Sequence, residues 1–271
     1  MSPFVEVHEL TKIYRRGGVF QWEGRKFRAI DRVSFSIEEH EVLGLVGESG
    51  CGKTTVARSI LCLDRPTSGS IRIGNSNPLE LRGAKLRGFR RSAQMIFQDV
   101  DRALDPRLTV RRSIEEALRS RGVARERRRE RIAELLELVG ISPDTMEHYP
   151  SSFSGGQRQR IVIARALAME PKFLILDEPV SNLDVSIQAQ IVNLLMELRR
   201  TLGLTYLFIS HDLNLISYIS DSIAVMKDGV IVEHGAAEQL IRKPHHPYTR
   251  TLFSAIPEHV RGEESSDSPR S

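Results

Sequence analysis

The sequence has few cysteines, little excess charge and no long apolar run. Its 271 residues include two cysteines, Cys51 and Cys62, too few for a disulfide framework or a four-thiolate metal site. Lys and Arg number 39 against 35 Asp and Glu, a net charge of +4 that is too small to indicate a nucleic-acid partner. This composition is typical of a protein from a reducing, cytosolic compartment.

The first residues give no indication of export. Met1–Leu10 alternates polar and apolar residues, with neither an apolar signal core nor a small-residue cleavage site. The apolar runs, such as Phe173–Leu176, are far shorter than the ~20 residues needed to span a bilayer. If the protein works at a membrane, we expect a partner to hold it there.

Short β-rich runs alternate with helical periodicity, which predicts an α/β fold whose sheet is at least partly parallel. Phe4–Leu10 and Val33–Ile37 alternate like half-buried strands and predict a small antiparallel subdomain. Val42–Val46, Phe173–Leu176 and Tyr206–Ile209 are continuous apolar runs, typical of strands buried on both faces. A chain of this length forms one or two domains.

The middle of the chain reads as helical. Residues 101–164 contain no convincing strand and predict a helical insertion, and residues 186–202 carry one apolar stripe at helical spacing. An arginine-rich run precedes Ile132 and is interpreted as a solvated helix face, with an anionic partner surface as the alternative. Residues 258–271 have little to bury and predict a disordered tail.

Gly47–Thr54 fits the phosphate-loop pattern G-x-x-x-x-G-K-[ST], and it lies between a buried strand and a helical stretch. Glycines in such a loop let backbone N–H groups point at phosphates, beside a helix N-terminus that favours anions. Lys53 would reach the β- and γ-phosphates, and the Thr54 hydroxyl would hold Mg²⁺. The pattern predicts nucleotide binding.

A second strand ends in an acidic pair. Asp177 and Glu178 follow the apolar run Phe173–Leu176. In a nucleotide hydrolase, a carboxylate here holds Mg²⁺ and its neighbour lies beside the γ-phosphate. Asp177 is therefore the predicted metal ligand, and Glu178 is the candidate general base.

With these motifs, the stretch Phe153-Ser154-Gly155-Gly156-Gln157 resembles the signature of one family, the ATP-binding subunits of ABC transporters. Leu is usual where Phe153 stands. Physically the stretch is a second helix N-terminus able to bind an anion. In that family two subunits meet head to tail, and each signature covers the γ-phosphate on the other's loop. The resemblance covers about residues 4–257.

Further positions match the same family. Gln98 matches the glutamine that links Mg²⁺ and the attacking water to the helical subdomain, and His211 matches a switch histidine that contacts the γ-phosphate. Ser181–Asp184 matches the loop that crosses the dimer interface, although Asn182 is commonly Ala. Tyr14 is similar to the aromatic residue that stacks on adenine, with simple surface packing as the alternative.

The resemblance implies a P-loop NTPase (RecA-like) core with an antiparallel β subdomain and a helical subdomain specific to ABC proteins, at about residues 101–164. It implies ATP and Mg²⁺ as cofactors, Glu178 and His211 as catalytic residues, and Thr54, Gln98 and Asp177 as the Mg²⁺ site. The ATP-binding residues it implies are Tyr14, Gly47, Glu48, Ser49, Gly50, Cys51, Gly52, Lys53, Thr54, Thr55, Gln98, Ser154, Gly155, Gly156 and Gln157.

Two features resemble the branch that energises uptake of dipeptides, oligopeptides and nickel: the extended link over Gly17–Arg28 and the C-terminal motif at residues 244–257. The resemblance implies a second ATPase subunit, two membrane permease subunits and an extracytoplasmic solute-binding protein. A heterodimer is favoured over a homodimer. Such a chain lies peripherally at the cytoplasmic face of the inner membrane, and no nucleic acid is expected.

Several alternatives remain open. Asn182 keeps nickel or metal-chelate import open, and the ATPase of a phosphonate-cleaving complex has the same motifs and a similar length. A repair ATPase would carry a long coiled coil, and a translation ATPase usually fuses two nucleotide domains in one chain. The solute is selected by other subunits, so specificity cannot be inferred from this chain.

Two local expectations concern Cys51 and the C-terminal motif. Lys53 and a helix N-terminus next to Cys51 favour a reactive thiolate. In the C-terminal motif, Pro247 is expected to limit helix, and Leu252 and Phe253 are expected to cover a partner surface, with packing on their own domain as the alternative. Because the motif lies beyond every nucleotide motif, we expect it to act independently of ATP binding.

Overall fold

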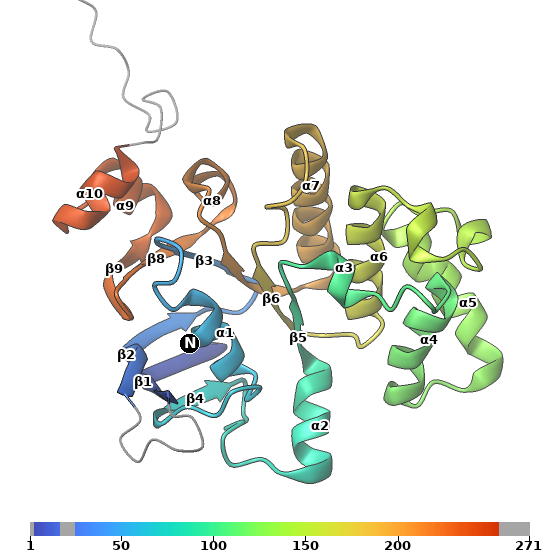
Figure 1. Ribbon diagram of the computed structural model, residues 1–271, viewed down its shortest axis with the longest axis horizontal. Helices are drawn as coiled ribbons and strands as arrows, with labels where there is room; N and C mark the ends of the chain where they lie inside the picture. Colours follow the sequence, from blue (N-terminus) through green and yellow to red (C-terminus); the bar gives the residue numbers. More distant parts are fainter. Residues whose placement is uncertain (1–2, 17–24, 255–271) are drawn as a thin grey trace, which may run out of the picture.

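The computed structural model describes residues 3–16 and 25–254 (Figure 1). Residues 17–24 of the extended link and the predicted tail at 258–271 lie outside the described residues. In the described part, no helix has both the length and the apolar character needed to cross a bilayer.

A six-stranded sheet forms the centre of the molecule. Its three continuous apolar strands, β6 (Phe173–Asp177), β7 (Thr205–Ile209) and β3 (Val42–Val46), are buried along their whole length, which confirms their prediction. The full order is β5-β6-β7-β3-β8-β9, and all neighbours are parallel except β8 and β9. The outer strands are β5 (Ala93–Ile96), β8 (Ser222–Lys227) and β9 (Val230–Ala236).

A separate three-stranded antiparallel sheet has the order β2-β1-β4. Its strands are β1 (Val5–Arg16), β2 (Arg25–Ile37) and β4 (Ser68–Ile73). The alternating runs of the sequence thus pair as predicted. Figure 1 shows this sheet beside α1 (Lys53–Ile60), the helix that follows the phosphate loop.

A group of helices lies on the other side of the central sheet (Figure 1). No strand interrupts the chain between residues 100 and 167, all of whose backbone is described. The group contains α3 (Val100–Ala103), α4 (Val110–Arg121), α5 (Arg125–Leu138) and α6 (Gly155–Leu167). The remaining helices are α2 (Gly83–Ser92), α7 (Val185–Leu202), α8 (Leu213–Ile219), α9 (Ala237–Arg242) and α10 (Pro247–Phe253).

The two faces of the central sheet belong to two apolar cores. On β3, Val42 and Val46 pack with the core of the helical group and α7. Leu43 and Leu45 point to the opposite face and pack with α1 and the antiparallel sheet. Because successive side chains of a strand alternate between faces, a fully apolar strand is needed to fill both cores.

The strand register places the carboxyl ends of several parallel strands side by side. Leu45 of β3 and Asp177 of β6 both lie opposite Ile209 of β7. Ile96, at the end of β5, lies opposite Leu176. Because the carboxyl ends of parallel strands share an edge, the residues that follow these strands gather in one place.

The C-terminal motif differs from its prediction. Pro247 does not limit a helix but begins α10, where its missing N–H would have had no partner. Phe253 is only 2% exposed and belongs to the core of this same chain, so it does not cover a partner surface. For Phe253 the docking expectation was therefore wrong, and the alternative of packing on its own domain is confirmed.

Candidate functional site

The phosphate loop joins β3 to α1 and needs glycine at two positions. A Cβ on Gly47 would lie 2.1 Å from the carbonyl oxygen of Met226, and its φ is +151°. A Cβ on Gly52 would lie 2.6 Å from the carbonyl oxygen of Ala29, at φ +115°. These backbone oxygens cannot move aside as the tip of a side chain can. A side chain at either position would therefore clash, and only glycine fits.

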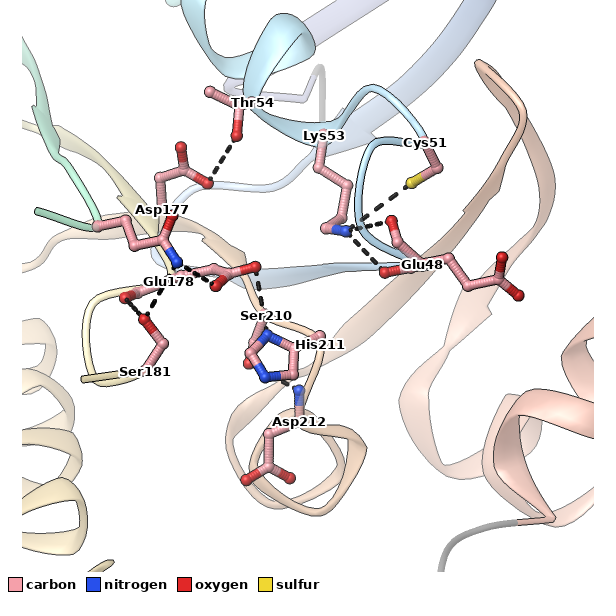
Figure 2. Close-up of polar contacts among 12 residues, drawn as sticks. Glu48, Cys51, Lys53, Thr54, Asp177, Glu178, Ser181, Ser210, His211 and Asp212 are labelled. Carbon is pink, nitrogen blue, oxygen red and sulfur yellow. Dashed lines mark hydrogen bonds and ion pairs between the residues drawn. The ribbon is translucent and has the colours of Figure 1, made fainter. Parts of the chain in front are cut away.

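Lys53 is buried at the start of α1, and its ammonium group lies inside the loop. Its Nζ donates hydrogen bonds to the carbonyl oxygens of Gly47, at 2.6 Å, and Glu48, at 2.9 Å (Figure 2). A buried ammonium group needs such acceptors, and phosphate oxygens are stronger ones.

The loop opens on a pocket of about 460 Å³. The pocket brings together residues from the ends of β3, β5, β6 and β7, as the strand register requires. All nine lining residues were singled out in the sequence. Its lining consists of Ser49, Gly50, Gly52, Lys53, Thr54, Thr55, Gln98, Glu178 and His211.

Asp177 and Thr54 form a pair of oxygen donors at the edge of this pocket. Thr54 Oγ1 donates a hydrogen bond to Asp177 Oδ1 at 3.2 Å (Figure 2). Burial raises the pKa of Asp177, although the Thr54 hydrogen bond acts in the opposite direction. Hydroxyl and carboxylate oxygens suit Mg²⁺, which binds few protein ligands beside phosphate. In the described part of the chain, no group of three or more His, Cys, Asp or Glu residues is arranged to hold a metal ion.

Glu178 is held in an unusual backbone conformation. Its φ is +49°, a region that non-glycine residues rarely adopt, and its N–H donates to the carbonyl oxygen of Ile209 at 2.9 Å. Its Oε2 accepts a hydrogen bond from Gln98 Nε2 at 2.8 Å, and its Oε1 lies 3.3 Å from His211 Nδ1 (Figure 2). Strain of this kind is tolerated where the surrounding structure fixes a functional side chain.

The side chains of the neighbouring residues His211 and Asp212 make different contacts. The Asp212 carboxylate caps α8 by accepting the N–H of Leu215 at 3.1 Å. The imidazole of His211 is 62% exposed and faces Glu178. His211 is thus not a satisfied core histidine, and its exposed ring lines the pocket.

Tyr14 lies outside the lining of the pocket. Its hydroxyl donates to Asp64 Oδ2 at 3.1 Å, and Lys12 Nζ lies 5.0 Å from the centre of its ring. Lys12 lies in β1 and Asp64 in the loop after α1, so the ring is held between these two segments. Adenine stacking on Tyr14 stays a prediction.

The signature residues begin α6. Ser154 Oγ accepts the N–H of Gln157 at 3.3 Å, while Gln157 Oε1 accepts the N–H of Ser154 at 2.9 Å, forming a capping box. A Cβ on Gly156 would lie 2.5 Å from Ile187 Cγ2 of α7, whereas one on Gly155 would lie 3.2 Å from Leu183 Cδ2. The structure does not bring these residues into the pocket of their own chain.

The environment of Cys51 differs from its prediction. Burial, the largest influence, raises the pKa of this thiol, although Lys53 acts in the opposite direction. The residue is only 8% exposed. Desolvation thus outweighs the nearby ammonium group, and the expected reactive thiolate is not favoured.

Two contacts at the site were missed in the sequence. Ser181 Oγ lies 3.5 Å from Gln98 Nε2 and donates to the carbonyl oxygen of Glu178 at 3.2 Å. Tyr248 of α10 accepts the N–H of Glu48 through its hydroxyl, at 3.3 Å. The motif containing Tyr248 was visible, but no sequence signal places it beside a loop 200 residues earlier.

Comparison with known proteins identifies the family. Residues 30–181 match the family described as "ABC transporter", and residues 232–270 match "Oligopeptide/dipeptide transporter, C-terminal region". The oligopeptide transport ATP-binding protein OppF of Streptococcus mutans is 50% identical over 256 residues, which cover 94% of this chain and 82% of that protein. The glutathione import ATP-binding protein GsiA of Pectobacterium atrosepticum is 48% identical, covering 94% of this chain and 41% of that protein.

Solved structures agree. CbiO1 from Clostridium perfringens, part of the ABC transporter complex CbiONQ, superposes with a TM-score of 0.79 at 26% identity, covering 96% of this chain and 98% of that one. The ATP-binding cassette MJ0796, in a dimeric post-hydrolysis state with ADP and Pi, gives 0.73 at 31% identity, covering 86% and 98%. The likeness confirms the α/β P-loop fold. The chain therefore belongs to the ABC transporter family, as an ATPase subunit with an oligopeptide/dipeptide transporter C-terminal region.

Proposed function

We propose that this chain hydrolyses ATP to energise the import of dipeptides or oligopeptides through an ABC transporter. The observation that carries the proposal is the joint presence, in one chain, of the ATPase pocket and the oligopeptide/dipeptide C-terminal region. OppF supports the same assignment, since it is named for oligopeptide transport and matches most of both chains.

In this proposal the phosphates of ATP lie in the loop at the start of α1. Lys53 transfers its hydrogen bonds from the carbonyl oxygens of Gly47 and Glu48 to the β- and γ-phosphates. Backbone N–H groups of the loop would donate to the same oxygens, and the helix dipole favours their charge. Tyr14 stacks on adenine at the β1 side of this helix.

Glu178 then acts as the general base. Its carboxylate accepts the proton of a water molecule that attacks the γ-phosphate. Gln98 and His211, which contact its two oxygens at 2.8 and 3.3 Å, orient the carboxylate and the water. Thr54, Asp177 and Gln98 would hold Mg²⁺, whose charge stabilises the phosphate oxygens during transfer.

The signature completes the site of a second subunit. Ser154–Gln157 starts a helix whose N-terminus is exposed and lies outside the pocket of its own chain. A helix N-terminus binds anions, so a γ-phosphate on a partner's loop is the matching ligand. We favour a heterodimer of two different ATPase chains over a homodimer.

The assembly would contain two membrane permease subunits and an extracytoplasmic solute-binding protein. The ATPase chain would lie peripherally on the cytoplasmic face of the inner membrane, held by the permease subunits. Closure of the ATPase dimer on ATP and its reopening after hydrolysis would move the permease between its two access states.

Growth of a strain in which the gene is disrupted tests the transported solute. We expect the strain to lose growth on a di- or oligopeptide that supplies a required amino acid, while it grows normally on the free amino acid. Restoring the intact chain should restore growth, and restoring a Lys53→Ala chain should not.

Two other outcomes would replace this proposal. Loss of nickel uptake with normal peptide use would assign the chain to a metal importer. Loss of phosphonate use, with a soluble lyase assembly in place of membrane proteins on copurification, would assign it to a phosphonate-cleaving complex. Uptake of glutathione should be measured in the same strain, because GsiA is nearly as similar to this chain as OppF.

A further inference from the structure

The C-terminal helix α10 touches the phosphate loop through one side chain. The hydroxyl oxygen of Tyr248 accepts the backbone N–H of Glu48 at 3.3 Å, across 200 residues of sequence. Glu48 is the second residue of the loop, and its carbonyl oxygen is one of the two that accept from Lys53. Tyr248 and Lys53 therefore contact the two polar backbone groups of one residue, the N–H and the carbonyl oxygen of Glu48.

Buried side chains and hydrogen bonds hold helix α10, and with it Tyr248, in place. Phe253 and Thr249 are buried, and His246 caps the helix by accepting the N–H of Tyr248 at 3.2 Å. Glu233 of β9 accepts the N–H groups of His245, at 2.8 Å, and His246, at 3.0 Å. Burial acts to raise the pKa of Glu233, but the hydrogen bonds its carboxylate accepts lower it overall, so it is charged at neutral pH.

The ring of Tyr248 is also held from the side of the sheet. Lys227 Nζ lies 4.8 Å from the ring centre, a cation–π contact. Lys227 ends β8, the strand that pairs with β3 directly before the loop, with Val225 opposite Val46. Figure 1 places α9 and α10 beside β8 and β9. The hydroxyl thus has a fixed position relative to the start of the loop.

We propose that Tyr248 is a positioning residue for the phosphate loop, so that the C-terminal region is part of the nucleotide-binding machinery. When Lys53 turns to the phosphates, it releases the carbonyl oxygens of Gly47 and Glu48. The Tyr248 hydroxyl keeps the N–H of Glu48 in place through this exchange and so keeps the following N–H groups aimed at the phosphates. The inference rests on the proposed function in that it takes ATP as the ligand.

The test replaces Tyr248 with Phe, which removes the hydroxyl and retains the ring over Lys227. One net hydrogen bond corresponds to about a fivefold change in an equilibrium constant. Without the hydroxyl, ATP and ADP have to order a loop that the unmodified chain holds in place before binding. We therefore expect their dissociation constants, measured by calorimetry on the full chain, to rise by a common factor of up to about five. In the assembled transporter the KM for ATP should rise while kcat changes little, because Tyr248 does not contact the reacting atoms.

Two matched variants serve as controls. Thr251→Ala removes a hydroxyl from the same helix, where it donates to the carbonyl oxygen of Pro247 at 3.2 Å. Tyr218→Phe makes the same chemical change at an exposed tyrosine of α8. Both should bind ATP as the unmodified chain does. Amide hydrogen exchange of the peptide containing Glu48 should be faster in Tyr248→Phe alone.

Each outcome decides one claim. If Tyr248→Phe bound both nucleotides with unchanged dissociation constants, the positioning role would be excluded while the proposed ATPase function stood. The positioning role would also be excluded if the loss of binding in Tyr248→Phe matched the fraction of unfolded protein. Circular dichroism at the assay temperature measures that fraction. If the unmodified chain bound no ATP, the proposed function itself would fail.

Discussion

At Glu178 the backbone and the side chain have conflicting preferences. Its φ of +49° suits glycine, and such a conformation costs on the order of 1–3 kcal/mol for another residue. The carboxylate nevertheless points into the pocket, where Gln98 and His211 contact it. The strain and the contacts together support the proposed role of Glu178 as the general base.

Glu178→Gln should therefore separate binding from hydrolysis. The amide keeps the shape but cannot accept the proton, so we expect ATP binding to persist and turnover to fall by at least ~10²-fold. Phosphate release by the assembled transporter measures this. Glu39→Gln, the same change at an exposed turn residue, should leave turnover unaltered; hydrolysis at the normal rate by Glu178→Gln would remove Glu178 as the base.

Alkylation should follow the burial of the two thiols. Cys51 is 8% exposed and its pKa is raised by burial, so we expect maleimide to label it slowly in the native chain. Cys62 is partly exposed and should react first, even though burial also raises its pKa. Mass spectrometry of the labelled peptides over time gives both rates. MgATP should slow Cys51 further and leave Cys62 unchanged; rapid labelling of Cys51 would show that Lys53 dominates its environment.

The pocket residues were predictable because their chemistry is local in sequence. A phosphate loop and an acidic strand end each occupy a few consecutive residues, and strand order alone brings them together. The pKa of Cys51 was not predictable, because burial depends on packing by distant segments. The same holds for the bond between Tyr248 and Glu48, whose partners lie 200 residues apart.

Among the elements, the buried central strands were the easiest to predict. Continuous apolar runs gave β3, β6 and β7 within a residue of their observed bounds. The shorter or more exposed strands β4, β5, β8 and β9 were not predicted. β5 has four residues, and β9 is an edge strand without a fully buried residue, so neither has a strong periodic signal.

Two glycines at the start of α6 should differ in how well they tolerate substitution by alanine. Gly156→Ala would place a methyl group 2.5 Å from the branched Ile187 on rigid α7, so we expect a loss of about 1–3 kcal/mol in the free energy of unfolding. Gly155→Ala faces the mobile tip of Leu183 at 3.2 Å and should cost less. Urea denaturation of both variants tests the order. Equal stabilities would show that α6 adjusts freely against α7.

For the whole molecule, Ser154 lies outside the pocket of its own chain, as the proposed site shared between subunits requires. We expect a Ser154→Arg chain to bind ATP on its own loop but to impair hydrolysis of the nucleotide on its partner's loop. In a transporter whose two ATPase chains can be labelled separately, photocrosslinked nucleotide should reveal which site fails. A defect confined to the loop of the mutated chain would contradict the head-to-tail arrangement.

Ser70→Arg provides the control for this experiment. Ser70 is an exposed residue of β4, in the antiparallel sheet on the opposite side of the central sheet from α6 (Figure 1). The substitution adds the same bulk and charge there. We expect both sites to hydrolyse ATP normally.

The long sequence separation between Glu48 and Tyr248 also sets an order of events during protein synthesis. Chains are made at about 5–20 residues per second, so Tyr248 is added roughly 10–40 s after Glu48. During that interval the emerging chain carries the whole phosphate loop but not the hydroxyl that anchors it. ATP therefore meets a fully positioned loop only after residues 230–253 have been made and packed. Under the proposed role of Tyr248, tight nucleotide binding thus waits until the rest of the fold exists.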